Sequence, residues 1–236
     1  MEEYKVKYYN YDIKKYPFVK MVTDLFNVNE LNEIHMLSNN KIIDKLFTNE
    51  NDDTTLYHDK FYKKLNNGWD EFEKVYINFI KKIATEIFHE NCIIYQSKPT
   101  FRVQLPNNIA VGGNKNDPPE RYGWHRDTDV GYDHPPFEKN FIIPLTNSNN
   151  DASVYIETYP GSDKFEPAIM KVGEFFQFKG GECIHGNKPN TTNKSRVSLD
   201  FRLILKNEYD KSYIKSSKLS SKKFVMGGYY NIMQGL

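Results

Sequence analysis

Residues 196–203 constrain the fold of this chain more than any other segment, because the polarity of their side chains alternates. The odd-numbered residues from Val197 to Leu203 are apolar. The even-numbered residues up to 202 are polar or charged: Arg196, Ser198, Asp200 and Arg202. Successive side chains of a β-strand point to opposite faces, so this alternation predicts a strand with one apolar and one polar face. Residues 101–105 repeat the pattern, with Arg102 and Gln104 opposite three apolar side chains.

Short apolar or alternating runs, separated by Gly, Pro and Asn, fill the chain after residue 91. We expect strands at residues 92–96, 101–105, 124–130, 140–145, 153–157, 174–178, 183–185 and 195–205. Strands that follow one another without intervening helices indicate an antiparallel sandwich or barrel. Because two of these strands have a polar face, the favoured geometry is a small barrel with a ligand-holding interior and helices outside.

The chain before residue 92 is expected to be mainly helical. Between about Asp70 and His89, apolar residues recur at three- and four-residue steps, which is typical of an amphipathic helix. Asp24 is the predicted N-cap of another helix, which carries Leu25 and Leu37. A length of 236 residues suits one domain. We therefore expect a single domain, 1–236, with a helical part at 1–91, a β core at 92–205 and a C-terminal tail at 206–236.

Charge and cysteine content narrow the classes of partner and compartment. The 32 Lys and Arg residues are balanced by 31 Asp and Glu residues, which leaves a formal charge of +1. This balance gives no broad positive field for binding nucleic acid or anionic membrane. Cys92 and Cys183 are far apart and outside any CxxC pattern, so a reducing compartment is expected. The N-terminus has no signal-peptide pattern and no stretch of about 18 apolar residues occurs, so we expect a soluble, cytoplasmic protein.

Three residues have the pattern of a metal site. His125 and Asp127 are two residues apart, which places an imidazole and a carboxylate on one face of a predicted strand. His185, near the end of another predicted strand, supplies a second imidazole. Two imidazoles and a carboxylate bind one face of an octahedral metal and leave the other face open, as in non-haem Fe(II) oxygenases. The alternative is a turn hydrogen bond between His125 and Asp127, with His185 an ordinary surface residue.

Arg196 lies eleven residues after His185, and Ser198 shares its strand face. A guanidinium binds a carboxylate through two parallel hydrogen bonds, and a hydroxyl adds a further donor. A dicarboxylate that chelates the metal through its 2-oxo acid end would reach this pair with its other end. The spacing therefore indicates a metal site together with an anchor for a cosubstrate.

This set of residues resembles the motif of the Fe(II)/2-oxoglutarate-dependent dioxygenase superfamily: His125-x-Asp127, His185 and Arg196-x-Ser198. More narrowly, residues 101–106, 124–127, 140–146, 185–187 and 196–202 resemble hydroxylases of streptomycin and related biosynthetic clusters. The resemblance covers about residues 95–205. It implies a double-stranded β-helix, that is, a jelly roll or cupin-like barrel, which uses Fe(II), 2-oxoglutarate and O2.

The resemblance also implies a role for individual residues. His125, Asp127 and His185 would bind Fe(II), and Arg196 would bind the C5 carboxylate of 2-oxoglutarate with help from Ser198. Asp rather than Gly or Ala at position 127 implies hydroxylation, or another outcome of hydrogen abstraction, instead of halogenation, in which the halide needs that position. The implied substrate is a polar small molecule, such as a sugar or a nucleotide-linked sugar derivative.

Further polar residues lie close to the motif strands. Asn140 and Asn187 are candidates for binding the cosubstrate or orienting a ligand. Candidates for the substrate site are, in chain order, Arg102, Gln104, Arg121 and Tyr122. Each has a plainer alternative in a turn, a salt bridge or contact with solvent. The long loop at 107–121 precedes the first metal ligand and is a candidate lid.

Two other functions use the same predicted scaffold. A cupin-like sugar isomerase or epimerase would bind a different divalent metal and would leave Arg196 and Ser198 without a role. A non-catalytic carbohydrate-binding jelly roll would bind no metal tightly. Binding of 2-oxoglutarate distinguishes the oxygenase from both.

Overall fold

The computed structural model describes residues 6–37, 55–110, 117–219 and 221–235. Its helices are α1 (Phe18–Phe26), α2 (Leu56–Asn66) and α3 (Asp70–Glu86), with short 3₁₀ helices η1 (Leu31–Leu37), η4 (Pro119–Arg121) and η5 (Asn150–Ala152). Its strands are β1 (Lys7–Asn10), β2 (Cys92–Gln96), β3 (Thr100–Gln104), β4 (Lys139–Pro144), β5 (Val154–Glu157), β6 (Phe165–Ala168), β7 (Glu174–Phe178), β8 (His185–Asn187), β9 (Arg196–Leu205) and β10 (Tyr230–Gln234). Within these ranges, no helix has the length and apolar character needed to span a membrane.

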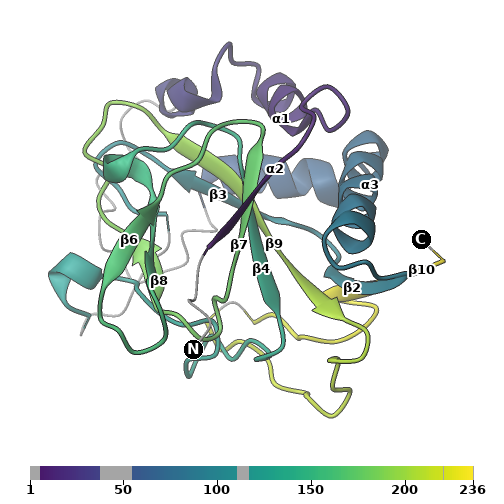
Figure 1. Cartoon of the computed structure of the whole chain (residues 1–236). Coiled ribbons are helices and arrows are strands. Elements are labelled where there is room, and N and C mark those ends of the chain that lie inside the picture. The colour runs from purple at the N-terminus through teal and green to yellow at the C-terminus, as the bar shows by residue number, and fades with distance from the viewer. Residues whose placement is uncertain (1–5, 38–54, 111–116, 220, 236) are drawn as a thin grey trace.

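The strands form two antiparallel sheets of different size (Figure 1). The larger sheet has the order β1-β7-β4-β9-β2-β10, and β3 also pairs with β9; the smaller sheet has the order β6-β5-β8. β9 pairs with β4 along one edge and with β3 and then β2 along the other. It is therefore a central strand, and its even-numbered side chains share one face of the sheet.

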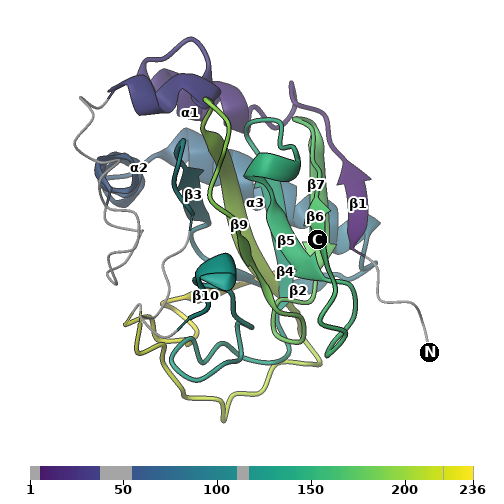
Figure 2. The same ribbon diagram turned by 90° about the vertical axis from the view of Figure 1, so that its left-hand side faces the viewer.

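Helices cover one face of the larger sheet, and the smaller sheet lies on the side of the other face (Figures 1 and 2). The apolar residues of α3 recur at helical spacing, and the stripe that they form is buried. Phe79 of α3 packs against Phe175 of β7 and Phe201 of β9, with ring centroids 5.1 and 6.3 Å apart. The odd-numbered apolar side chains of β9 are buried in the same core. The even-numbered side chains of β9 therefore point into the space between the two sheets.

The predicted fold class is confirmed, since the protein is mainly antiparallel β-sheet with N-terminal helices packed outside. Its two sheets have the jelly-roll arrangement in an open form. Among the described residues, no ladder of hydrogen bonds joins them into a closed barrel. The predicted ligand-holding interior is the space between the two sheets.

Two expectations about individual elements are wrong. Asp24 lies in the last turn of α1 and is not its N-cap, because α1 begins at Phe18 and ends at Phe26, before the C-cap Asn27, whose φ is 56°. Residues 124–130 form turns with an isolated bridge at His125 instead of a strand. The structure also contains elements that were not predicted: β1, α2, β6 and, within the C-terminal tail, β10. Three of these are strands, whose stability depends on distant partners more than on local sequence.

Candidate metal centre

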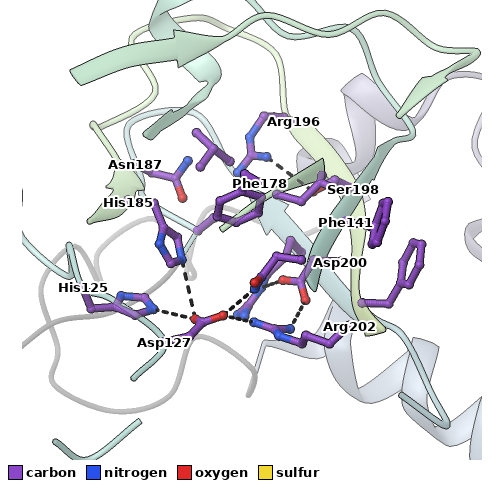
Figure 3. A pocket seen from close by; sticks show the side chains of 17 residues that line it. His125, Asp127, Phe141, Phe178, His185, Asn187, Arg196, Ser198, Asp200 and Arg202 are labelled. Atoms are coloured by element: carbon purple, nitrogen blue, oxygen red, sulfur yellow. Dashed lines mark hydrogen bonds and ion pairs between the residues drawn. The ribbon is translucent and has the colours of Figure 1, made fainter. Parts of the chain in front are cut away.

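His125, Asp127 and His185 converge from two separate segments of the chain (Figure 3). His185 begins β8, and its backbone forms an antiparallel bridge with that of His125, with N–O distances of 3.0 and 2.9 Å. The chain then turns, and the Asp127 N–H donates to Gly180 O at 2.9 Å. The bridge aligns the two histidines, and the turn places Asp127 beside both.

The ligand atoms of these three side chains lie around one point. Asp127 Oδ1 is 3.6 Å from His125 Nε2 and 3.6 Å from His185 Nε2, and the three ligand atoms lie within 4.8 Å of one another. All three residues are buried. Two imidazole nitrogens and one carboxylate oxygen at this spacing suit a single metal ion.

Backbone carbonyls orient both imidazoles. His125 Nδ1 lies 2.8 Å from Gly123 O, and His185 Nδ1 lies 3.1 Å from Cys183 O. A carbonyl oxygen can only accept a hydrogen bond, so each Nδ1 carries the proton and donates it. In the neutral ring, Nε2 then has a free lone pair, which is the form that binds a metal.

Neighbouring rings hold both histidines in place, and burial keeps His185 neutral. The His125 ring stacks on Tyr132 with 3.7 Å between centroids, and the His185 ring meets Phe178 edge-on at 5.0 Å. Burial and the neighbouring His125 lower the pKa of His185 to about 4. His185 is therefore neutral at physiological pH, as a metal ligand must be.

Asp127 uses its two oxygens differently. Oδ1 faces the histidines, whereas Oδ2 accepts hydrogen bonds from Asn140 Nδ2 and, at 3.1 Å, from Arg202 Nη2. Burial alone would raise the pKa of this carboxyl, but the charge of Arg202 and the nearby histidines hold it well below its ordinary value. Asp127 is thus ionised, with one oxygen left for a cation.

Arg196 lines the same pocket as the three candidate ligands. It is buried, and both hydrogen bonds of its guanidinium go to neutral oxygens: Nε to Gln104 Oε1 at 3.0 Å and Nη1 to Ser198 Oγ at 3.4 Å. Burial and repulsion from Arg102 lower its pKa to about 10, so it stays charged at neutral pH. Within the described part of the chain, no ion pair joins it to a carboxylate. A buried guanidinium in this state favours an anionic ligand.

Asp200 lies between Arg196 and Arg202 on the polar face of β9 and lines the pocket. It accepts a hydrogen bond from Arg102 Nε at 2.7 Å and another from Arg202 Nη1. Burial alone would raise the pKa of Asp200, but Arg202 and Arg102 lower it to about 2. The wall therefore carries fixed, paired charges.

The sequence is similar to the streptomycin biosynthesis protein StrG of Streptomyces griseus, with 31% identity over 206 residues that cover 87% of this chain and 88% of StrG. The chain belongs to the StrG family. The resemblance to proteins of streptomycin biosynthesis is thereby confirmed. No protein-family model matches the sequence.

Solved structures are similar to this StrG-family chain at low identity. AviO1 from Streptomyces viridochromogenes Tue57 has a TM-score of 0.45 and 11% identity, over 88% of this chain and 93% of AviO1. EvdMO1 has a TM-score of 0.41 and 18% identity, over 58% of this chain and 33% of EvdMO1. Similarity at this level leaves the function to be argued from the site itself.

The other candidate residues of this StrG-family chain differ in whether they line the pocket. Arg102, Asn140 and Asn187 line the pocket, and Asn187 Nδ2 donates to Ser153 O at 2.8 Å. Gln104 lies behind Arg196, because its Nε2 donates to Lys188 O at 2.7 Å while its Oε1 accepts from Arg196.

Arg121 and Tyr122 are not among the described residues that line the pocket. Arg121 donates to Asp163 Oδ1 at 2.6 Å on the surface, and Tyr122 is buried elsewhere. Of the candidate lid at 107–121, residues 111–116 lie outside the described residues.

Sequence reasoning assigned no role to Arg202 and Glu138, which lie close to Asp127. Glu138 Oε2 lies 2.8 Å from His134 Nδ1 and 3.8 Å from Arg202 Nε. The alternation of β9 placed Arg202 on the polar face, which was a usable signal. Glu138 precedes β4 in a loop, where no local pattern points to it.

Proposed function

We propose that this chain is a non-haem Fe(II), 2-oxoglutarate-dependent oxygenase that hydroxylates a polar small molecule. The observation that carries the proposal is the shared pocket. It contains a buried His/Asp/His triad and a buried guanidinium that lacks a carboxylate partner among the described residues. A metal alone would explain the triad, but not the arginine.

The donor set suits Fe(II). His125 and His185 offer Nε2 lone pairs, and Asp127 offers one ionised oxygen, which together form the two-histidine, one-carboxylate set of non-haem iron oxygenases. These three residues would hold the metal. An aspartate at this position supports hydroxylation over halogenation, since it occupies the place that a halide would need.

The anchor suits a dicarboxylate. Arg196 and Ser198 would bind the distal carboxylate of 2-oxoglutarate, and Gln104 would keep the guanidinium in its orientation. Asn187 and Asn140, on the pocket lining, are positioned beside the ligand set. Charge supports this arrangement, because a bound carboxylate would neutralise the buried Arg196.

Fe(II) and 2-oxoglutarate, when bound, supply the oxidation in which O2 and 2-oxoglutarate are consumed and succinate, CO2 and hydroxylated substrate are formed. The chain's own residues bind and orient. The carbonyls of Gly123 and Cys183 hold the imidazoles, and Phe178 with Ile142 gives the pocket an apolar side that limits water.

A polar substrate is supported by the Arg102–Asp200 pair on the pocket wall, whose side chains retain some exposure. A guanidinium edge and a carboxylate edge side by side suit hydroxyl groups, which both donate and accept. StrG is a streptomycin biosynthesis protein, which supports a biosynthetic role and a sugar or nucleotide-sugar derivative as the substrate class.

Titration of the anaerobic Fe(II)-loaded protein with 2-oxoglutarate, followed by visible absorption, tests the proposal without a known substrate. We expect a weak charge-transfer band that is absent in His125→Ala. Arg196→Ala should need roughly 10- to 100-fold more 2-oxoglutarate, since hydrogen bonds to charged groups contribute about 1.5–3 kcal/mol. Arg121→Ala, an arginine turned toward Asp163 at the surface, is the matched control and should titrate like the wild type.

The outcomes separate the candidate functions. Stoichiometric metal without a charge-transfer band would favour a metal-dependent sugar isomerase or epimerase. Failure of the wild-type protein to bind metal would leave a non-catalytic carbohydrate-binding module.

A further inference from the structure

Asp127 is contacted by Arg202 on the side opposite the two histidines (Figure 3). We propose that Arg202 is a positioning residue, which holds Oδ2 of Asp127 so that Oδ1 alone faces the metal. This inference rests on the proposed function, because it requires a metal at His125, Asp127 and His185.

The guanidinium of Arg202 contacts three carboxylates from three different segments. Nη2 donates to Asp127 Oδ2 at 3.1 Å, Nη1 donates to Asp200 Oδ1, and Nε lies 3.8 Å from Glu138 Oε2. The side chain is 7% exposed. Nε has no hydrogen-bond partner among the described residues. The two hydrogen bonds from Nη1 and Nη2 fix the orientation of the planar guanidinium, so Nη2 points at Asp127 from one direction.

The carboxylates that contact Arg202 accept further hydrogen bonds from other residues. Asp200 also accepts from Arg102, and Glu138 also accepts from His134 and from the hydroxyl of Tyr230. Rotation of Arg202 would therefore break contacts on several elements at once. The cluster is rigid because each carboxylate has more than one donor.

Asp127, His134 and Glu138 also have ligand atoms within 4.8 Å of one another, which is the spacing of a second cation site. Arg202 already contacts both carboxylates of this group. We therefore assign the positive charge of this cluster to the guanidinium and not to a second metal.

Loss of Arg202 should change how Asp127 binds a metal. Oδ2 would keep Asn140 as a donor but would lose its charged partner. The carboxylate could then turn and present both oxygens, and its negative charge would be less compensated. Partners that orient a metal ligand typically contribute roughly 10- to 100-fold to metal affinity.

The test uses Co²⁺ alone with the full-length protein, and measures its affinity by calorimetry and its visible spectrum at saturation. Arg202→Gln should bind Co²⁺ roughly 10- to 100-fold more weakly, with altered visible bands. Arg202→Lys keeps the charge but lacks the fork that reaches Asp127 and Asp200 together, so its affinity should fall between the two. If Arg202→Gln does not fold, shown by the absence of a melting transition, Arg202→Lys carries the test.

The matched control is Arg121→Gln, which removes a guanidinium that bonds to Asp163 at the surface, away from the described pocket lining. It should retain wild-type affinity for Co²⁺ and a wild-type spectrum. Folded Arg202 variants with wild-type affinity and spectrum would overturn the positioning role and leave the metal site intact. Failure of the wild-type protein to bind Co²⁺ would instead refute the metal site and, with it, the proposed function.

Discussion

Gly180 and Gly186 lack a Cβ at two places where another side chain approaches the backbone. A Cβ at Gly180 would lie 2.7 Å from Asn140 Nδ2 and 2.9 Å from Asp127 Oδ2. A Cβ at Gly186 would lie 2.2 Å from Trp124 Cδ1. Neither glycine is needed for a positive φ, so close approach is the reason for both. The site therefore depends on the lack of a side chain at these two glycines as well as on its metal-binding residues.

Gly180→Ala should weaken metal binding, because the new methyl group displaces Asn140 and Asp127 from their contact. We also expect a loss of about 1–3 kcal/mol in unfolding free energy, the usual cost of overpacking. Calorimetry with Co²⁺ and urea denaturation measure the two effects. Gly228→Ala is the control, because its Cβ would be 3.5 Å from Val225, at ordinary contact distance. Equal affinities for the two variants would contradict the tight packing at Gly180.

The central strand β9 separates two environments by its alternation. Its odd-numbered side chains join the core formed with α3, and its even-numbered side chains line the pocket. The same strand thus contributes side chains to the hydrophobic core and to the pocket. A substitution on one face of β9 does not directly contact the side chains on the other face. We therefore expect substitutions in the core to lower the free energy of unfolding while changing the metal affinity of the site little.

Phe79→Ala in α3 tests this separation. Phe79 is fully buried among aromatic rings, so its truncation should lower the unfolding free energy by about 3–5 kcal/mol. The affinity of the folded variant for Co²⁺ should stay at the wild-type level. Ile77→Ala on the same helix is the control, since Ile77 is 41% exposed and should change stability by less than about 0.5 kcal/mol. A large drop in the affinity of folded Phe79→Ala would show that the two faces are coupled.

The larger sheet joins both ends of the described chain, because β1 and β10 form its two edges. β10 pairs with β2, and Tyr230 at its start bonds to Glu138 beside the candidate metal centre. The candidate ligands come from the segment around the bridge and from β8, which pairs in the smaller sheet. A metal that binds them would therefore stabilise the folded molecule as a whole.

Thermal unfolding should show one cooperative transition, with secondary structure and aromatic environment lost together. Co²⁺ at 100 times its dissociation constant should stabilise the fold by about 2.7 kcal/mol. For a chain of this size, that corresponds to a rise in Tm of roughly 5–10 °C. Circular dichroism in the far and near ultraviolet measures both effects, with His185→Ala as the variant that should show no metal-dependent rise. Two separated transitions would contradict a single domain.

Local patterns in the sequence were sufficient to predict features that a single helix or strand determines. The period-two alternation of residues 196–203 predicted β9 and both of its faces, and the helical spacing after Asp70 predicted α3. The types and spacing of His125, Asp127, His185 and Arg196 indicated a metal and an anion, because few side chains supply those ligands.

Tertiary structure decided what depends on residues far apart in the chain. The expected strand at 124–130 is a turn, and His125 meets His185 through a backbone bridge. β10 exists as a strand because β2, far away in the sequence, offers it a free edge. Arg202 could be placed on a polar face from the sequence, but its contact with Asp127 and Glu138 could not. The physical reason is that strand pairing and buried charge compensation arise between segments, so no local pattern encodes them.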